Sequence, residues 1–425
     1  MEQTMKTFYK DKAAACAAMV KGAEDEIPYV RELAAITAEI AREPRMADIL
    51  RRWRDVNSGR VPDRSPVWSR PAGCWSEMLP KETLVCKDQY LRKLEYFFRQ
   101  ILLKRDVDDD HPVYDYYTVP AVFEVTPDPP YGFADKQHKL DGYGSAWGYD
   151  AALNSPEDFD RLTIPQYAFN AKKTAEAVAA AETVFDGILE VRVSSVNGYF
   201  SAPTICTPAA KLRGLEQLMM DMALEPHLVH RLMEVLTQGT LNYLDAIEAS
   251  GTIIPNTDEP MFLSDPLRPE PTDGKYTLKD CWTAGNSQEF DQVDPAMTSE
   301  FLIDYQKRIF ERFGAVSYGC CENLTKKIDP VLSIPNLRIF VASAWSDLGE
   351  IVKRAGDKHC IMWRHSASDV TCLETLDKVR RDTERGVELL NGCRYQVVLR
   401  ELQSLFGRES RLYDWAQMCK EIVSR

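Results

Sequence analysis

Two adjacent cysteines and an acid follow a short apolar run in the second half of the chain. The run ends in Tyr318-Gly319-Cys320-Cys321-Glu322-Asn323 and is followed by a helical segment. Soft thiolates and a hard carboxylate can bind a metal, and a carboxylate can also transfer a proton. In barrels and open α/β folds, chemistry collects at the carboxyl ends of strands. The motif therefore predicts a metal or acid/base site at such an end.

Side-chain alternation along an extended chain separates the two cysteines. If the segment stays extended, Tyr318, Cys320 and Glu322 share one face. Cys321 then points the other way, and a single buried cysteine is more often a small packing residue than a ligand. We therefore expect Cys320 and Glu322, rather than Cys321, to face the site.

Further polar residues follow other expected strand ends or reach in from a long loop: Asn197, Asp258, Glu259, Gln288, Glu289, Trp345, Arg364, His365, Arg400 and Glu401. Arg364 suits a substrate carboxylate or phosphate, or an ion pair with an acid on a neighbouring strand. His365 suits a buried histidine, a metal ligand or a donor to substrate. Asp258 and Glu259 suit acid/base chemistry or metal binding, or form a solvated loop.

Apolar runs alternate with amphipathic segments from Pro66 onward, which predicts alternating strands and helices. Eight strands are expected, at Pro66–Ser69, Val113–Val125, Ile188–Val196, Thr252–Pro255, Gly314–Tyr318, Leu337–Ala344, Cys360–Trp363 and Tyr395–Leu399. This pattern predicts an α/β fold, a (β/α)8 TIM barrel over residues 61–425. Residues 1–60 read as an N-terminal helical extension, in which Leu33, Ile36 and Ile40 repeat at helical spacing.

Helices are expected at 84–103, 171–181, 211–222, 226–249, 298–313, 347–355, 371–390 and 412–423. Asp347 and Asp369 are predicted N-terminal caps, since an aspartate accepts from free helix amides. Two long connections, 126–165 and 260–295, are rich in Pro, Gly and Asp and suit either lids or disorder. The acids Asp108 to Asp110, together with His111, are expected in a solvated turn.

Composition restricts the class of partner. The 425 residues carry a formal charge of −13, which disfavours a nucleic-acid partner. Eleven cysteines without paired CxxC spacing favour a reducing cytoplasm. Residues 1–12 lack the apolar core of a signal peptide, and no apolar run is long enough to span a bilayer.

Three stretches resemble the uroporphyrinogen decarboxylase superfamily, a set of (β/α)8 barrels, over roughly residue 60 to the end. Pro66-Val67-Trp68-Ser69-Arg70-Pro71-Ala72-Gly73-Cys74 is similar to the P-V-W-x-M-R-Q-A-G-R that opens the decarboxylases, one residue shorter. Tyr114-Asp115-Tyr116-Tyr117-Thr118-Val119-Pro120 is similar to their S-D-I-L-V-V-P. Gly198 to Glu216 resembles a third segment, through Ala202-Pro203 and Leu212-Arg213-Gly214.

The true decarboxylases fit poorly. Their catalytic aspartate maps to Asp115, but their second opening arginine is Cys74 here, and their active-site tyrosine falls near Ala209. Their last-strand histidine has no counterpart, because no histidine follows His365. A substrate with eight carboxylates also needs a basic cleft, which a charge of −13 does not favour.

The methyltransferase branch of the superfamily looks closer. Its members move a methyl group between a small substrate and a corrinoid on a partner protein. Their fifth strand ends in H-x-C-G-N, which supplies two zinc ligands, and their last strand supplies a cysteine. Cys320 matches the family cysteine, Tyr318 replaces the histidine, and Arg400-Glu401 stands where the last cysteine would be. The resemblance thus implies an altered zinc site.

We expect a mixed zinc site formed by Cys320, Glu322, His365 and Glu401. Catalytic roles are predicted for Asp115, Tyr318 and Arg364, and substrate binding for Asn197, Asp258, Glu259, Gln288 and Trp345. The resemblance implies a corrinoid supplied by a partner protein, since the chain lacks the D-x-H-x-x-G corrinoid-binding motif.

Three functions remain open, in this order. The first is a corrinoid-linked methyltransferase acting on a methoxy, methylamine or related small compound. The second is a metal-free decarboxylase or lyase using Asp115 and Arg364 on a small carboxylate. The third is a non-catalytic barrel that serves as a binding subunit. A homodimer is also left open.

Overall fold

The computed structural model describes residues 7–134, 137–139 and 147–425. They belong to two compact units. The first unit comprises residues 1–119, 175–192 and 363–425, and the second comprises 120–174 and 193–362. The predicted domain boundary at residue 60 stays a prediction.

Parallel strand pairing defines the fold class. In the first unit, β1 (Val67–Pro71) pairs in parallel with β12 (Tyr395–Leu402). In the second unit, β9 (Ala315–Tyr318) pairs in parallel with both β8 (Trp282–Gly285) and β10 (Leu337–Ala342). The predicted α/β class is therefore confirmed.

The closed eight-stranded barrel is not shown by the described residues. Six strands form one sheet in the order β1-β12-β11-β10-β9-β8, and the chain passes from the second unit to the first within β11 (Cys360–Arg364). The other strands of the described ranges form three two-stranded sheets, β2-β7, β3-β6 and β4-β5. Their bounds are β2 Tyr116–Pro120, β3 Phe123–Thr126, β4 Gln137–Lys139, β5 Trp147–Tyr149, β6 Gln166–Phe169 and β7 Glu190–Ser194.

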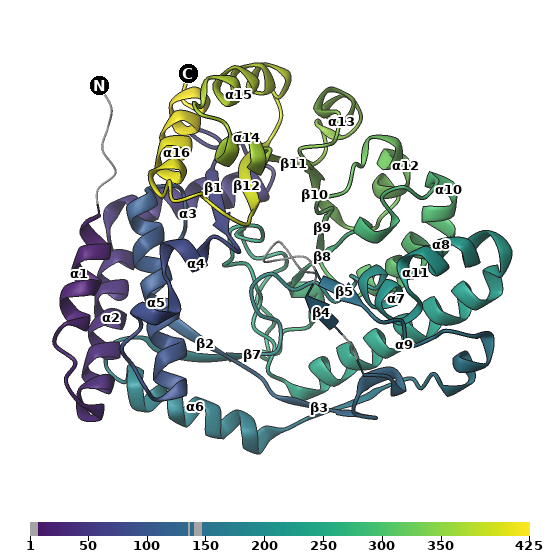
Figure 1. Ribbon diagram of the computed structural model, residues 1–425, viewed down its shortest axis with the longest axis horizontal. Coiled ribbons are helices and arrows are strands. Elements are labelled where there is room, and N and C mark those ends of the chain that lie inside the picture. The colour runs from purple at the N-terminus through teal and green to yellow at the C-terminus, as the bar shows by residue number, and fades with distance from the viewer. Residues whose placement is uncertain (1–6, 135–136, 140–146) are drawn as a thin grey trace. The chain divides into compact units, whose positions relative to one another are not determined.

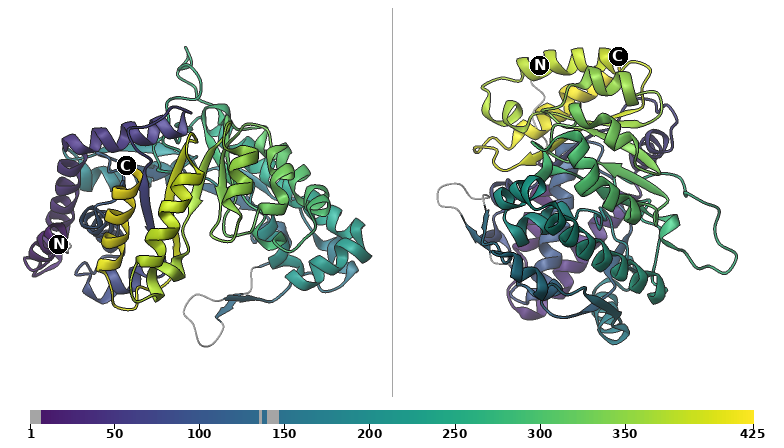
Figure 2. Two further views of the ribbon diagram at one scale, coloured as in Figure 1. Left: turned by 90° about the horizontal axis from the view of Figure 1, so that it is seen from above. Right: turned by 90° about the vertical axis from the view of Figure 1, so that its right-hand side faces the viewer.

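Helices α1, α2 and α5 of the first unit pack against one another, as the purple and blue ribbons of Figures 1 and 2 show. The predicted helical stripe of Leu33, Ile36 and Ile40 lies on α2 and is buried. Helices of this unit are α1 Phe8–Ala17, α2 Glu26–Ala41, α3 Pro44–Asn57, α4 Trp75–Met78, α5 Gln89–Val107, α14 Ala367–Cys372, α15 Asp377–Leu389 and α16 Ser410–Val423. Helix α6 (Ala171–Phe185) begins in the second unit and continues in the first.

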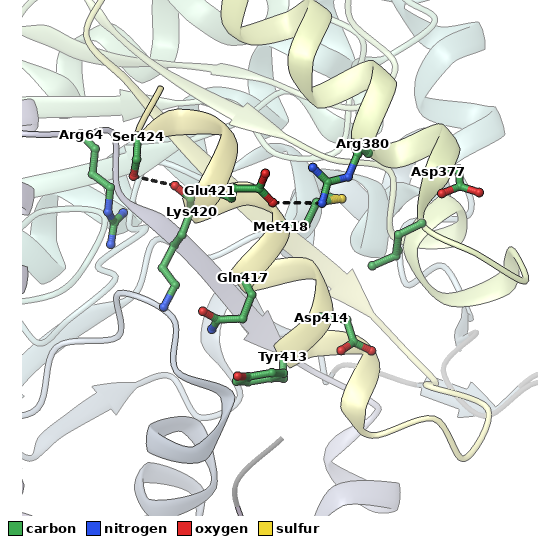
Figure 3. A pocket seen from close by; sticks show the side chains of 11 residues that line it. Arg64, Asp377, Arg380, Tyr413, Asp414, Gln417, Met418, Lys420, Glu421 and Ser424 are labelled. Atoms are coloured by element: carbon green, nitrogen blue, oxygen red, sulfur yellow. Dashed lines mark hydrogen bonds and ion pairs between the residues drawn. The ribbon is translucent and has the colours of Figure 1, made fainter. Parts of the chain in front are cut away.

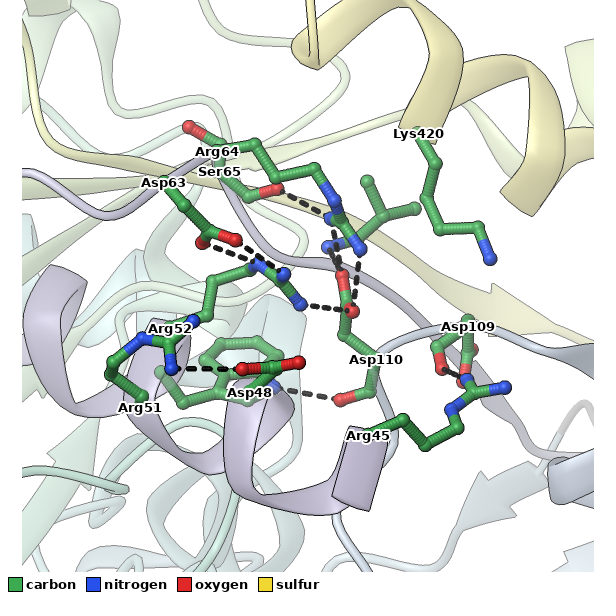
Figure 4. A network of polar contacts seen from close by, with 12 residues as sticks. Arg45, Asp48, Arg51, Arg52, Asp63, Arg64, Ser65, Asp109, Asp110 and Lys420 are labelled. Atoms are coloured by element: carbon green, nitrogen blue, oxygen red, sulfur yellow. Dashed lines mark hydrogen bonds and ion pairs between the residues drawn. The ribbon is translucent and has the colours of Figure 1, made fainter. Parts of the chain in front are cut away.

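An ion-pair network fastens α3 to the start of β1 (Figure 4). The Asp110 carboxylate accepts from Arg52 at 2.9 Å, from Arg64 at 2.7 Å and from the backbone N–H of Val67 at 2.8 Å. Asp109 is also buried, and it accepts from the backbone of β1. The predicted solvated turn is therefore wrong for Asp109 and Asp110, because basic side chains and strand amides satisfy both carboxylates inside the unit.

The core of the second unit is built around the long helix α9. Its residues Leu232, Leu236 and Leu244 are fully buried and belong to one apolar cluster with Phe301 and Phe313. The helices of this unit are α7 Cys206–Arg213, α8 Leu215–Leu224, α9 Pro226–Ser250, α10 Pro295–Thr298, α11 Asp304–Phe310, α12 Ile328–Leu332 and α13 Leu348–Ala355. Burial of this cluster holds α9 against α7, α8 and α11.

One predicted strand is absent and another was missed. Thr252–Pro255 forms no strand, whereas Trp282–Gly285, inside the connection predicted at 260–295, forms β8. The side chain of Asn256 takes the place of a ladder: its amide nitrogen donates to the carbonyl of Trp282 at 3.1 Å, and its oxygen accepts from the Trp282 N–H at 2.8 Å. Pro255 has no N–H to donate to a ladder, so this side chain satisfies the start of β8 instead.

The two predicted caps differ in outcome. Asp347 caps α13, since its carboxylate accepts from the N–H of Glu350 at 3.1 Å. Asp369 does not cap α14. Ser366 does, and its hydroxyl accepts from the Asp369 N–H at 3.2 Å. The helix begins at Ala367, so its N-cap position falls on Ser366, three residues before Asp369, and Ser suits that position as well as Asp.

Candidate functional site

The end of β9 turns sharply at Gly319. This residue has a φ of +118°, a conformation that side chains disfavour. A Cβ there would lie 2.8 Å from Val341 and 2.9 Å from Leu324. The strand stops at Tyr318, and residues 320–322 form a bend. The alternation that predicted one common face therefore ends before Cys320.

Glu322 holds this bend against the end of β8. It is 2% exposed, and its Oε1 accepts from the backbone N–H of Ser287 at 2.8 Å and from the Ser287 hydroxyl at 3.2 Å. Its Oε2 accepts from the backbone N–H of Cys320 at 2.8 Å. Burial raises the pKa of Glu322, while the donated hydrogen bonds oppose that rise. With both oxygens engaged, Glu322 acts as a brace between two strand ends.

Cys320 and Cys321 lie side by side. Their Sγ atoms are 3.6 Å apart, and both side chains are half-buried. Seven of the other nine cysteines are buried. The expectation that Cys321 points away from Cys320 is not met, because the bend removes the alternation of an extended strand.

Tyr318 faces the helix layer. It is fully buried, its ring contacts Phe310 of α11 edge to face, and its hydroxyl donates to Gln306 at 3.1 Å. Burial raises the pKa of Tyr318 well above its usual value, and the charge of Glu322 adds to the rise. This arrangement holds Tyr318 as a neutral packing residue beneath the bend, and its predicted catalytic role stays a prediction.

A second polar cluster lies behind Glu322. The thiol of Cys206 donates to Asn286 Oδ1 at 3.2 Å, and the Thr207 hydroxyl donates to Glu289 Oε1 at 2.6 Å. The other oxygen of Glu289 is buried and has no partner among the described residues. Burial, followed by the charge of Glu289, raises the pKa of Cys206 well above its usual value, so this thiol stays protonated.

The predicted substrate-binding residues of the second unit are more open. Asn197 is half-buried, and its amide nitrogen donates to the Ser194 carbonyl at 2.9 Å. Asp258 is half-buried, while Glu259 and Gln288 are exposed, as is Trp345 at 68%. A Cβ on Gly198 would lie 3.0 Å from Glu259, so the structure brings the 197–198 and 258–259 segments together. Substrate binding by these residues stays a prediction.

Arg364 and Glu401 form an ion pair in the first unit. Arg364 is 1% exposed, and its Nη1 lies 3.0 Å from the Glu401 carboxylate. The sequence left open whether Arg364 binds a substrate anion or a neighbouring acid. The structure shows the second arrangement.

His365 is held between two tryptophans of the first unit. Its ring lies edge to face with Trp363 and Trp415, and the Trp415 indole N–H donates to Nδ1 at 3.1 Å. Burial lowers the pKa of His365 to about 4, so the ring is neutral at pH 7. With Nδ1 as an acceptor, the ring hydrogen is on Nε2. In this tautomer neither ring nitrogen is open to a metal, and the predicted role of His365 as a metal ligand stays a prediction.

Asp115 precedes β2 and is exposed. Its backbone carbonyl accepts from the N–H of Glu190, the first residue of β7. The residue thus lies at the amino-terminal end of its strand, opposite to the end where catalytic residues of parallel barrels gather. Its catalytic role stays a prediction.

A polar groove of about 850 Å³ on the first unit contains none of the predicted site residues (Figure 3). It is lined by Arg64, Leu376, Asp377, Arg380, Tyr413, Asp414, Gln417, Met418, Lys420, Glu421 and Ser424. Arg380 pairs with Glu421 at 3.1 Å, and Lys420 pairs with Asp108 at 2.9 Å. Because both basic side chains already form ion pairs with acids, the groove is a poor candidate for binding an anion.

Ser287, Asn286 and Cys321 are the site residues that the sequence did not indicate. Ser287 and Asn286 directly follow β8, and recognising Trp282–Gly285 as a strand would have placed them at a carboxyl end. Cys321 has a clearer signal, because a glycine precedes the two cysteines and a glycine permits a turn.

The fold and site define an α/β protein whose neighbouring parallel strands β8 and β9 present thiols and a braced carboxylate at their carboxyl ends. No protein-family model matches the chain, and no curated protein matches it. Among solved structures, a methyltransferase from Methanosarcina mazei is similar over 88% of this chain and 98% of its own, with a TM-score of 0.48 and 11% identity. Similarity at this level assigns neither a family nor an activity.

Proposed function

We propose that the chain is a methyltransferase that moves a methyl group between a small methylated compound and a corrinoid carried by a partner protein. The substrate class is a methoxy compound, a methylamine or a similar molecule, and zinc assists. The observation that carries the proposal is the half-exposed Cys320 thiol, held at the carboxyl end of β9 by the brace of Glu322. The resemblance to the methyltransferase branch implies a thiolate ligand at this position, which supports the proposal.

The residues present suit a soft metal. A thiol at the surface of a braced bend is accessible and fixed, which a metal ligand requires. When bound, zinc lowers the pKa of a thiol or polarises the atom that carries the methyl group. The chain's part is to hold Cys320 in place through Glu322 and Ser287 and to keep the neighbouring strand ends in register.

The transfer balances without a further reagent. The bond between the methyl carbon and its oxygen or nitrogen breaks, and the electron pair stays with that atom, which takes up a proton. The lone pair of the reduced cobalt forms the new bond to carbon.

The lyase alternative relies on Asp115 and Arg364. Asp115 lies at the amino-terminal end of a strand and Arg364 pairs with Glu401, so neither placement favours it.

The test uses the purified full-length protein with free cob(I)alamin in place of the partner-bound corrinoid. A methoxy-aromatic compound and mono-, di- and trimethylamine serve as methyl donors, and methylcobalamin is followed by its absorption spectrum. We expect transfer from one donor class, loss of transfer in Cys320→Ser, and no change in Cys372→Ser, an exposed thiol on α14. Equal transfer by Cys320→Ser and the unaltered protein would refute the proposal.

The metal is tested separately. We expect stoichiometric zinc in the purified protein and loss of transfer after chelation. Absence of zinc, with transfer unharmed by chelators, would remove the metal from the proposal while leaving methyl transfer intact. We propose that a separate partner protein carries the corrinoid. The formation of a homodimer stays a prediction. No helix in the described ranges is long and apolar enough to cross a membrane.

A further inference from the structure

Cys321 has no role in the sequence-based ligand set, but its sulfur lies beside that of Cys320. The two Sγ atoms are 3.6 Å apart. In a tetrahedral zinc site with Zn–S bonds of about 2.3 Å, two sulfurs lie about 3.8 Å apart. The observed separation therefore matches one edge of the coordination tetrahedron with almost no rearrangement.

This juxtaposition depends on a specific backbone. Neighbouring residues of an extended strand point to opposite faces, so adjacent cysteines in a regular strand would hold their sulfurs apart. Here the positive φ of Gly319 ends the strand, and the N–H of Gly319 donates to the carbonyl of Gly285 at 2.9 Å. The Ser343 hydroxyl donates to the Glu322 carbonyl at 2.8 Å. The bend is thus fastened to the strands on both sides, β8 and β10.

Charge and access favour a cation at the pair. Glu322 is buried beneath the bend, and its two carboxylate oxygens accept hydrogen bonds from backbone amides. Two thiolates beside this acid would repel one another, and a divalent cation between them removes that repulsion. Both thiols are half-exposed, so a cation reaches them without opening the core.

We propose that Cys320 and Cys321 together form a bidentate thiolate site for a soft divalent cation such as zinc. The inference rests on the proposed function for the identity of the metal, but the pairing of the two sulfurs is independent of any activity. The pair supplies two of four tetrahedral positions and leaves the others to further ligands or to substrate. Cys321 would thereby supply a second metal ligand in a sequence where Tyr318 replaces the family histidine and Arg400-Glu401 replaces the last-strand cysteine.

The experiment titrates the reduced, metal-free, full-length protein with Cd²⁺ and records the thiolate-to-cadmium charge-transfer absorption. We expect saturation at one equivalent. Cys320→Ser and Cys321→Ser should each lose about half of the absorption and bind at least about tenfold more weakly, the loss typical of disturbed metal sites. The matched control Cys372→Ser should behave like the unaltered protein. Circular dichroism shows whether each variant keeps its fold.

The outcomes separate the two proposals. A Cys321→Ser variant that titrates like the unaltered protein would overturn the bidentate site, even if methyl transfer is observed. Absence of a charge-transfer band at one equivalent of Cd²⁺ would overturn it as well. A band that requires both cysteines, in a protein that transfers no methyl group, would support the site and refute the proposed function. If Cys321→Ser fails to fold, Cys321→Ala and labelling of both thiols with and without Cd²⁺ give the same decision, since only a paired site protects both.

Discussion

Replacing His365 by glutamine tests the buried neutral imidazole of the first unit. Burial lowers the pKa of His365 to about 4 in the folded chain, whereas an unfolded histidine titrates near about 6.5. The unfolded chain therefore takes up a proton below pH 6.5 that the folded chain refuses until about pH 4. Stability contributed by the neutral ring is complete above pH 6.5 and is lost as the pH falls.

The expected loss is large enough to measure. Between pH 7.5 and pH 5 this one residue should lower the free energy of unfolding by about 2 kcal/mol, since one pKa unit corresponds to about 1.4 kcal/mol. Glutamine keeps an acceptor for the Trp415 indole N–H but does not titrate. The variant should therefore lose about 2 kcal/mol less than the unaltered chain over the same pH range.

Urea unfolding followed by tryptophan fluorescence at both pH values measures the difference. His227→Gln is the matched control for the loss of an imidazole, because the His227 side chain is 72% exposed. His111, whose pKa burial also lowers to about 4, leaves a residual dependence of the same sign in every variant. If His365→Gln and the unaltered chain lose equal stability between pH 7.5 and pH 5, the neutral buried ring is refuted.

Two further substitutions test the framework of each unit. Asp110→Asn should cost about 3–5 kcal/mol in urea unfolding, because it removes the buried carboxylate that pairs with both Arg52 and Arg64. Asp63→Asn, at the 46% exposed partner of Arg52, should cost less than about 1 kcal/mol, and equal costs would contradict the network. Gly319→Ala should cost about 2–5 kcal/mol of unfolding free energy and weaken Cd²⁺ binding, because the added methyl group strains the backbone and overlaps Val341 and Leu324. Gly59→Ala, where φ is also positive but the space is open, should cost only about 1–2 kcal/mol. A Gly319→Ala variant as stable as Gly59→Ala would contradict the tight turn.

Periodicity predicted the elements that are long or strongly patterned. The stripe on α2, the 25-residue α9 and the strand before Gly319 all lie where the apolar spacing indicates. Strand β8 escaped because its four residues, Trp-Thr-Ala-Gly, carry no alternation and lie in a stretch rich in turn residues. The apolar run Thr252–Pro255 misled for the opposite reason: it is apolar, but Asn256 replaces its ladder with side-chain hydrogen bonds.

The site shows where residue spacing stops being informative. Cys320 and Glu322 were placed on one face by an alternation that holds only in extended backbone. After Gly319, whose φ is positive, the Glu322 carboxylate accepts from the Ser287 and Cys320 amides, and the Cys321 sulfur lies beside that of Cys320. None of these outcomes follows from residue types alone, because each depends on backbone angles over four consecutive positions.

A brace of this kind has a consequence for chemistry. A side chain that satisfies backbone amides from two strand ends fixes the loop between them, and a fixed loop holds its neighbouring side chains without an entropic cost at the moment of binding. Glu322 does so from between the ends of β8 and β9, so the acid need not touch a metal or substrate to matter. In the proposed site the two thiols would therefore bind the cation, and the Glu322 carboxylate would hold them in position.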